Sequence, residues 1–220
     1  MQFSYHTALF DLDGTLVDTS PGITRSVQYA LAAEGINEPD LSRLLRFIGP
    51  PLWQSFSEFY GFDTARSERA VQTYRERYTA KGVHEAKLYD GIEALLRALR
   101  AGGVRLATAS SKPECFVRDV LEEQGILSYF DAVVGSELDG RRSDKCELIE
   151  EALRRLGVKT HSGVVMIGDR CFDLEGARAA QVDFIGVLFG FGTPQELSGY
   201  SRARLAHSPE DVLRLCRADR

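Results

Sequence analysis

The segment Phe10-Asp11-Leu12-Asp13-Gly14-Thr15-Leu16 constrains what this chain can fold into more than any other stretch. A short apolar run ends there in two carboxylates, Asp11 and Asp13, followed by Gly14 and Thr15. The run has the length of a buried strand. In strand geometry both carboxylates would point to one face, which is costly unless a cation or proton lies between them. Because glycine allows a sharp turn, the stretch predicts a metal-binding loop at a strand end.

Two other interpretations exist for an acidic turn of this kind. A calcium loop of the EF-hand type needs a glutamate at its twelfth position, but that position is Gly22, and Gly14 comes too early. A solvated acidic turn is the second alternative, and these residues alone leave it open.

The composition excludes several classes of protein. With 220 residues and 44% hydrophobic content, the chain can form one or two globular domains with a proper core. The net charge of -5, without any block of Lys or Arg, argues against a nucleic-acid partner. The sequence has no apolar run of membrane-spanning length and no signal-peptide pattern at its start. We therefore expect a cytoplasmic protein, a monomer or homodimer, that acts on a small molecule.

The four cysteines are scattered and form no C-x-x-C pair, so the sequence predicts neither a zinc site nor a disulfide framework. Cys115, Cys146 and Cys216 fall in helical patterns and are expected to be small packing residues. Cys171 instead lies in a polar loop near other candidate functional residues.

Residues 19–88 show helical spacing of apolar side chains and no strand signal. We expect four helices there, the first ending at Gly35 and the others near residues 41–48, 52–60 and 65–80. This pattern predicts an all-helical cap domain over residues 19–88, inserted into a core made of residues 1–18 and 89–220.

From residue 89 onward, helical and strand patterns alternate. Strands are expected at residues 104–109, 130–135, 163–167 and 183–188, and helices at 91–101, 113–124, 144–156, 174–180 and 210–216. Such alternation predicts an α/β fold with a Rossmann-like parallel sheet covered by helices on both faces.

Polar side chains that could act in catalysis or binding follow the predicted strands, at the edge where parallel sheets collect their functional groups. They are Asp11, Asp13, Ser110, Ser111, Lys145, Asp169 and Asp173. Each has an ordinary explanation when taken alone: a serine can cap a helix, most lysines are exposed, and acids favour helix starts. Together they would gather four carboxylates, a lysine and one or two hydroxyls.

These residues carry a resemblance. Asp11-Leu12-Asp13-Gly14-Thr15, then Ser110, Lys145 and Gly168-Asp169 with Asp173 resemble the four motifs of the haloacid dehalogenase superfamily, across essentially the whole chain. The helical insert resembles the cap of its phosphoglycolate-phosphatase-like branch. Residues 47–52, 168–170 and 186–192 resemble bacterial members described as 5′-nucleotidases.

The resemblance implies a Mg²⁺-dependent phosphatase of small phosphorylated metabolites, nucleoside 5′-monophosphates or 2-phosphoglycolate. Asp11 would attack phosphorus and form an aspartyl-phosphate, and Asp13 would protonate the leaving oxygen and later activate water. Mg²⁺ would be held by Asp11, Asp169, the backbone carbonyl of Asp13, and Asp173 directly or through water.

The phosphate would be held by Ser110, Ser111, Lys145 and the Gly14–Thr15 loop, with Lys145 neutralising charge shared with Asp11. An acid at position 13 favours phosphoryl transfer over carbon–halogen cleavage, because a departing halide needs no proton. Three residues depart from common family patterns, namely Asp90, Ser111 and Cys171.

The cap would close over the site and select the leaving group. Candidate cap contacts are Gly49, Pro50, Trp53 and Phe56, although Phe56 is better explained by packing inside the cap, and Trp53 fits either role. An aromatic cap surface favours a nucleobase over a small carboxylate.

Two alternatives from other classes remain. A sugar phosphomutase resembling β-phosphoglucomutase would share the four motifs, but it needs basic cap residues for a second phosphate, and residues 47–53 contain none. A non-catalytic binding protein on the same scaffold is disfavoured by the intact set of Asp11, Asp13, Lys145 and Asp169.

Overall fold

The computed structural model describes residues 3–218, and the chain divides into two compact units. One unit spans Met1–Val17 and Leu88–Arg220, and the other spans Asp18–Lys87. Two short strands, β2 (Val17–Asp18) and β3 (Lys87–Leu88), pair with each other where the chain passes from one unit to the other.

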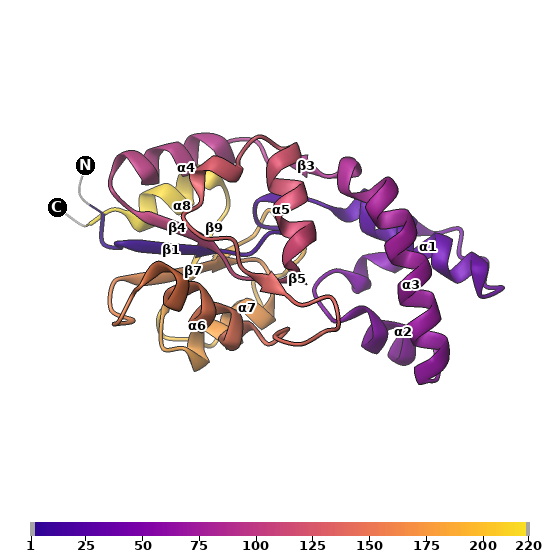
Figure 1. The fold of residues 1–220 in the computed structure, drawn as a ribbon. Helices are drawn as coiled ribbons and strands as arrows, with labels where there is room; N and C mark the ends of the chain where they lie inside the picture. The colour runs from indigo at the N-terminus through magenta and orange to yellow at the C-terminus, as the bar shows by residue number, and fades with distance from the viewer. Residues whose placement is uncertain (1–2, 219–220) are drawn as a thin grey trace. The chain divides into compact units, whose positions relative to one another are not determined.

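The first unit is built on a five-stranded parallel sheet in the order β4-β1-β7-β8-β9 (Figure 1). The strands are β1 (Thr7–Phe10), β4 (Arg105–Thr108), β7 (Val164–Gly168), β8 (Asp183–Val187) and β9 (Ala203–Ala206). Phe10 is in register with Thr108 on one side and Ile167 on the other. Strands β4, β1 and β7 therefore end at nearly the same level, which brings the residues that follow them to one edge of the sheet.

Helices cover both faces of this sheet, as the sequence predicts (Figure 1). Helices α6 (Lys145–Leu156) and α7 (Cys171–Ala179) pack on one face, and α4 (Ile92–Ala101) and α8 (Pro209–Cys216) on the other. The continuous apolar runs of β1 and β7 are fully buried between these layers, because a parallel sheet covered on both faces has no solvated side.

The second unit is helical, as predicted. Its elements are α1 (Ser20–Ala33), η1 (Leu41–Phe47), α2 (Leu52–Tyr60), α3 (Thr64–Ala80) and η2 (Gly82–Glu85). Phe56 is fully buried, edge-on to Phe47 and stacked on Phe62, so it packs inside this unit. Trp53 on the same helix is 40% exposed.

The structure does not have the continuous strand that was expected at residues 130–135. Leu127–Tyr129 forms the short helix η3, residue 132 makes only an isolated bridge to Ala107, and β6 is confined to Gly135–Ser136. Residues 131–134 still exchange backbone hydrogen bonds with the segment Leu106–Ser110, but the N–H of Val134 donates to the Thr108 hydroxyl and not to a backbone carbonyl. β6 pairs with β5 (Ser110–Pro113), a strand where a loop was expected.

Other differences are smaller. Strand β9, an edge strand of four residues with an exposed centre, was not expected from the sequence. Helix α7 begins at Cys171, three residues before the expected start. Helix α5 (Glu114–Glu123) forms as expected, but Cys115 is exposed on it, so the packing role expected of that cysteine is wrong.

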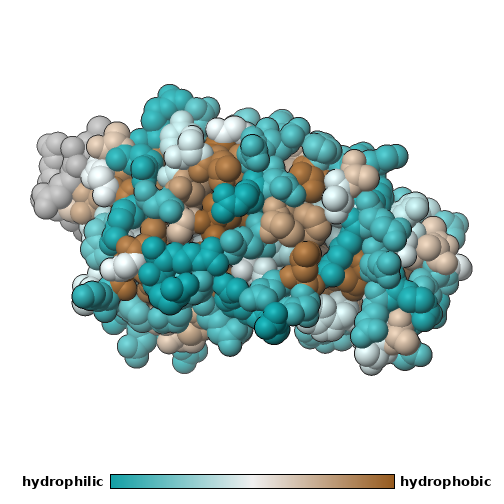
Figure 2. All heavy atoms as spheres, viewed as in Figure 1, coloured by the Kyte–Doolittle hydropathy of each residue, from teal (hydrophilic) through white to brown (hydrophobic). Residues whose placement is uncertain are grey.

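The surface is mixed in character. Hydrophilic side chains cover most of the face seen in Figure 2, with smaller hydrophobic areas between them. Within residues 3–218, no helix has both the length and the apolar character needed to cross a membrane.

Candidate active site

Three buried carboxylates meet at the carboxyl edge of the sheet. Asp11 follows β1, Asp169 follows β7, and Asp173 lies in the first turn of α7. One oxygen from each lies within 4.8 Å of the others, and all three side chains are buried. The nearly common level of the strand ends explains the meeting, because Phe10 is paired with Ile167, and Asp11 and Asp169 follow that pair by one and two residues.

Lys145 lies among these carboxylates. Its Nζ is 3.1 Å from Asp11 Oδ1 and 2.8 Å from Asp173 Oδ1, and it donates to the carbonyl of Ala109 at 3.0 Å. Its side chain is 5% exposed, so the alternative of an ordinary exposed helix lysine is wrong. Asp144 caps the start of α6 by accepting from two backbone N–H groups and thereby fixes where Lys145 begins the helix.

Burial and mutual repulsion perturb these groups. Burial raises the pKa of Asp11 to about 6, although the Lys145 ammonium opposes the rise. Burial, followed by repulsion from Asp173 and Asp11, raises the pKa of Asp169 well above its usual value. Burial alone would lower the pKa of Lys145, but attraction to Asp11 and Asp173 outweighs it and holds this pKa above its usual value. The ionised forms of Asp11 and Asp169 are thus held at a cost in free energy.

The cluster fits a divalent cation. Three carboxylates and one ammonium leave two negative charges in a buried space, and hard oxygen ligands are those that Mg²⁺ prefers. In addition, Asp11 Oδ1 and Asp173 Oδ1 are buried without a well-aligned hydrogen-bond donor among residues 3–218, although both lie at ion-pair distance from Lys145. These oxygens are available as ligands.

Asp169 is held from two sides. The Thr15 hydroxyl donates to its Oδ1 at 3.3 Å, and the backbone N–H of Phe191 donates to its Oδ2 at 2.7 Å. Gly14 adopts φ +79°, and a Cβ at that position would overlap Asp169 Oδ2. The N–H of Gly14 donates to Val17 O within the turn. Gly14 and Thr15, expected to bind phosphate, thus shape the loop and orient Asp169 in this structure.

Asp13 has its own lysine. Lys112 Nζ donates to Asp13 Oδ1 at 2.9 Å and Oδ2 at 3.0 Å, with the two side chains 6% and 14% exposed. β1 ends at Phe10, so the strand alternation from which a common face was expected for Asp11 and Asp13 stops before both residues. The Asp13 carboxylate is paired with Lys112 and is not one of the three clustered carboxylates, although it is close enough to contribute to the raised pKa of Asp11. A metal contact of Asp13, expected through its backbone carbonyl, stays a prediction.

The two serines at the start of β5 differ. Ser110 is buried, and its hydrogen bond to Asp11 helps to hold that carboxylate ionised, against the rise in pKa that burial causes. Ser111 instead donates to the carbonyl of Ser143, two residues before Lys145. Ser110 thus lies within the cluster, whereas the Ser111 hydroxyl supports the loop that precedes Lys145.

The expected cap contacts lie in the helical unit. Gly49 has φ +109° at the turn before α2, and Pro50 beside it is half-buried. Trp53 has the exposure that a ligand contact requires, whereas Phe56 has none.

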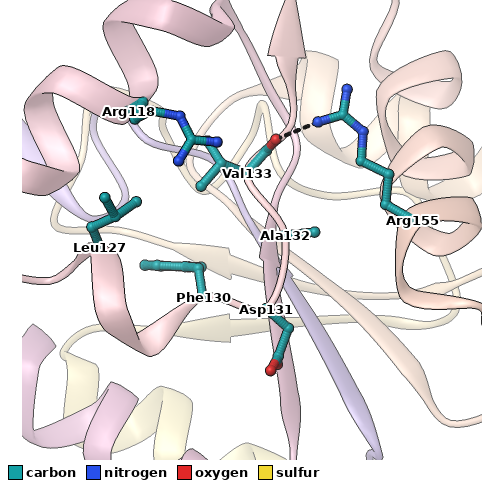
Figure 3. A pocket seen from close by; sticks show the side chains of 7 residues that line it. All are labelled: Arg118, Leu127, Phe130, Asp131, Ala132, Val133 and Arg155. Atoms are coloured by element: carbon teal, nitrogen blue, oxygen red, sulfur yellow. Dashed lines mark hydrogen bonds between the residues drawn. The ribbon is translucent and has the colours of Figure 1, made fainter.

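A separate hollow of about 310 Å³ lies in the first unit (Figure 3). Arg118 and Arg155 reach it from α5 and α6, on either side of the extended segment that carries Phe130 and Val133. Arg155 donates to Val133 O and is paired with Glu114, so most of its charge is already neutralised. None of the expected site residues lines this hollow.

Sequence reasoning missed two contributions to the site. The Lys112 ammonium was visible next to Ser110-Ser111, but its partner was not assigned. The Phe191 N–H is a backbone donor, which no residue type reveals. For residues 190–192, the sequence offered only the family resemblance and no indication of a contact with Asp169.

Comparisons with known proteins agree with this geometry. The model of the haloacid dehalogenase-like hydrolase family matches residues 8–187. A 5′-nucleotidase of Pseudomonas aeruginosa is 50% identical over 196 residues, covering 89% of this chain and 88% of that protein. The tyrosine-protein kinase PtkA of Mycobacterium tuberculosis is 36% identical over 91% of this chain and 68% of its own length. The crystal structure of a predicted phosphatase from Clostridium acetobutylicum has a TM-score of 0.91 and 44% identity, with coverage of 96% and 97%.

The chain belongs to the haloacid dehalogenase-like hydrolases. The α/β fold with an inserted helical region is confirmed, as is the expected place among the phosphatases of this family. Phosphoglycolate phosphatases are more distant relatives, such as one of Nitrosospira multiformis that is 30% identical over 86% of this chain and 86% of that protein.

Proposed function

We propose that this protein is a Mg²⁺-dependent phosphatase whose preferred substrates are nucleoside 5′-monophosphates. The observation that carries the reaction class is the buried group of Asp11, Asp169 and Asp173 around Lys145, with Asp13 held nearby by a different lysine. Such a site separates a nucleophile from an acid–base group, which phosphomonoester hydrolysis requires.

When bound, the metal neutralises the cluster and withdraws charge from the phosphoryl oxygens. Asp11 attacks phosphorus, and an aspartyl-phosphate forms while the bond to the leaving oxygen breaks. Lys145 stays beside Asp11 and offsets the charge that develops there. The Ser110 hydroxyl, which is hydrogen-bonded to Asp11 in this structure, turns to donate its one proton to a phosphoryl oxygen.

Asp13 gives a proton to the leaving oxygen and takes one from the attacking water in the second half-reaction, so its net protonation is restored. Lys112 keeps the Asp13 carboxylate in one orientation through both oxygens. Replacing Asp13 by Asn should therefore slow hydrolysis of AMP by about 10²- to 10⁴-fold. The loss in kcat/KM should be much smaller for p-nitrophenyl phosphate, because nitrophenolate leaves without a proton, whereas kcat falls for both substrates wherever hydrolysis of their common aspartyl-phosphate limits the rate.

Equal losses in kcat/KM for the two substrates would contradict the role of Asp13 as the acid. The matched control is Asp18→Asn, an acid nearby in sequence that accepts from the backbone N–H of Ser20. This variant should leave the ratio of the two rates unchanged.

Two observations support the substrate class. The 5′-nucleotidase of P. aeruginosa is half identical over most of both chains. Trp53 presents an aromatic ring at 40% exposure on α2 of the helical unit, which suits stacking on a nucleobase. Trp53→Ala should raise KM for nucleotides and leave KM for 2-phosphoglycolate unchanged.

The first test is phosphate release from a panel of phosphomonoesters, with and without Mg²⁺, with Asp11→Asn as the blank. The panel contains nucleoside 5′-monophosphates, 2-phosphoglycolate and glucose 1-phosphate. We expect metal-dependent release, fastest from nucleotides and abolished in the variant. Faster release from 2-phosphoglycolate would overturn the substrate, and no release above the blank would overturn the reaction.

Two further arms address the alternatives. Conversion of glucose 1-phosphate to glucose 6-phosphate would indicate a mutase. Transfer of phosphate from ATP to tyrosine would indicate the activity named for PtkA.

A further inference from the structure

The segment that follows β8 reaches the proposed metal site through its backbone. The N–H of Phe191 donates to Asp169 Oδ2 at 2.7 Å, so this oxygen is oriented by a loop that lies more than twenty residues further along the chain. Asp169 is itself fully buried. A shift of this loop would therefore free one oxygen of a metal-ready carboxylate to rotate.

The same loop passes so close to Asp169 that only glycine fits at one position. A Cβ on Gly192 would overlap the carbonyl oxygen of Asp169. Because the two backbones approach so closely, the loop must be held in a defined position against Asp169, which requires further contacts.

Glu196 supplies that position. Its Oε1 accepts from Arg170 Nε at 2.8 Å and from the backbone N–H of Cys171 at 3.0 Å. Cys171 is the first residue of α7, so the carboxylate also caps the helix that carries Asp173. Burial opposes ionisation of Glu196, but the Cys171 N–H and the Arg170 guanidinium outweigh it and keep the pKa of Glu196 below its usual value.

One side chain thus ties three parts of the site together: the loop at Phe191, the residue beside Asp169, and the helix start beside Asp173. We propose that Glu196 is a positioning residue of the metal site. By bonding the 189–196 loop to the start of α7, it holds Asp169 and Asp173 in the orientation that binds the metal. This inference rests on the proposed metal-dependent function. Residues that orient metal ligands from outside the coordination sphere commonly set the metal affinity.

A purely structural role makes a different prediction. If Glu196 only contributed a half-buried ion pair, its loss would lower stability with or without Mg²⁺ by the same amount. If it positions the ligands, its loss must weaken Mg²⁺ binding itself.

The test uses the full chain with Glu196→Ala, Glu196→Gln and, as the matched control, Gln195→Ala on the neighbouring exposed residue. Mg²⁺ affinity is measured by calorimetry and by the Mg²⁺ dependence of the thermal unfolding midpoint. We expect Glu196→Ala to bind Mg²⁺ about 10- to 100-fold more weakly. Glu196→Gln should lose less, because its amide oxygen still accepts from Cys171 N–H. Gln195→Ala should match the wild type.

Activity gives a second readout. For Glu196→Ala, the Mg²⁺ concentration for half-maximal rate should rise while kcat at saturating Mg²⁺ stays near the wild-type value, since Glu196 touches no reacting atom. Unchanged Mg²⁺ affinity in a folded Glu196→Ala variant would overturn the inference. If the Ala variant does not fold, wild-type affinity in Glu196→Gln and an equal affinity in a Glu196→Asp variant would overturn it.

The two proposals fail in distinguishable ways. Absence of Mg²⁺ binding to the wild type would overturn the proposed function and this inference together. Mg²⁺ binding that is strong in the wild type and insensitive to Glu196 would overturn only the inference.

Discussion

The metal-free protein should be less stable than its Asp11→Asn variant at neutral pH. Burial of the Asp11 carboxylate beside two other carboxylates is the reason, because the ionised form is disfavoured in the folded state. Asparagine has nearly the same shape and carries no charge, so the substitution removes this penalty.

The magnitude follows from the pKa of Asp11. The rise from its ordinary value of 3.8 to about 6 corresponds, at about 1.4 kcal/mol per pH unit, to about 3 kcal/mol. Above pH 6 the wild type should be less stable than the variant by this amount. Well below the unfolded pKa of 3.8 both the folded and the unfolded carboxyl are protonated and the difference should vanish, so the loss of stability develops as pH rises from about 4 to 6.

The assay is urea-induced unfolding of both proteins after EDTA treatment, at pH values from 4 to 8. Adding Mg²⁺ at pH 7.5 should stabilise the wild type and have little effect on the variant. The difference in unfolding free energy between the two proteins should therefore shrink or change sign. A variant that is less stable than the metal-free wild type at pH 7.5 would refute the reasoning. So would a difference that does not shrink on acidification.

Three further predictions concern packing, thiols and a helix cap. Phe56→Ala should lower stability by about 3–5 kcal/mol because the ring is fully buried, whereas Trp53→Ala should lower it distinctly less, because the Trp53 side chain is 40% exposed; urea unfolding checks both. Cys115 is exposed and should react with a thiol reagent within the native state, while Cys216, buried and with its pKa raised by burial to about 12, should react only on unfolding. Asp144→Ala should cost about 1 kcal/mol and lower activity as well, because it caps the helix that begins with Lys145.

Local sequence patterns were enough to place most of the elements. Continuous apolar runs predicted β7 and β8 to within two residues, since buried parallel strands need apolar side chains on both faces. The same rule was less accurate at residues 130–135, where the backbone still bonds to Leu106–Ser110 but the N–H of Val134 donates to the Thr108 side chain. An apolar run cannot show which group its backbone will meet.

In the candidate site, too, some features could be predicted from the sequence and others could not. Asp11, Asp169, Asp173 and Lys145 were expected together, and the structure brings them together, because each follows or precedes a strand whose end lies at the same edge of the sheet. The roles of Ser111, Gly14 and Thr15 were less predictable, since their hydroxyl and backbone groups can turn to several neighbours.

The sequence by itself determined the reaction class, because the chemistry requires particular residue types and their order along the chain follows the order of the strands. Only the tertiary structure decided which charges pair. Lys112 and Asp13 are 99 residues apart, and no local pattern relates them. The hydrogen bond from Phe191 N–H to Asp169 and the one from Cys171 N–H to Glu196 depend on where a distant loop crosses the sheet edge. Such contacts arise from packing in three dimensions, where short-range periodicity carries no information.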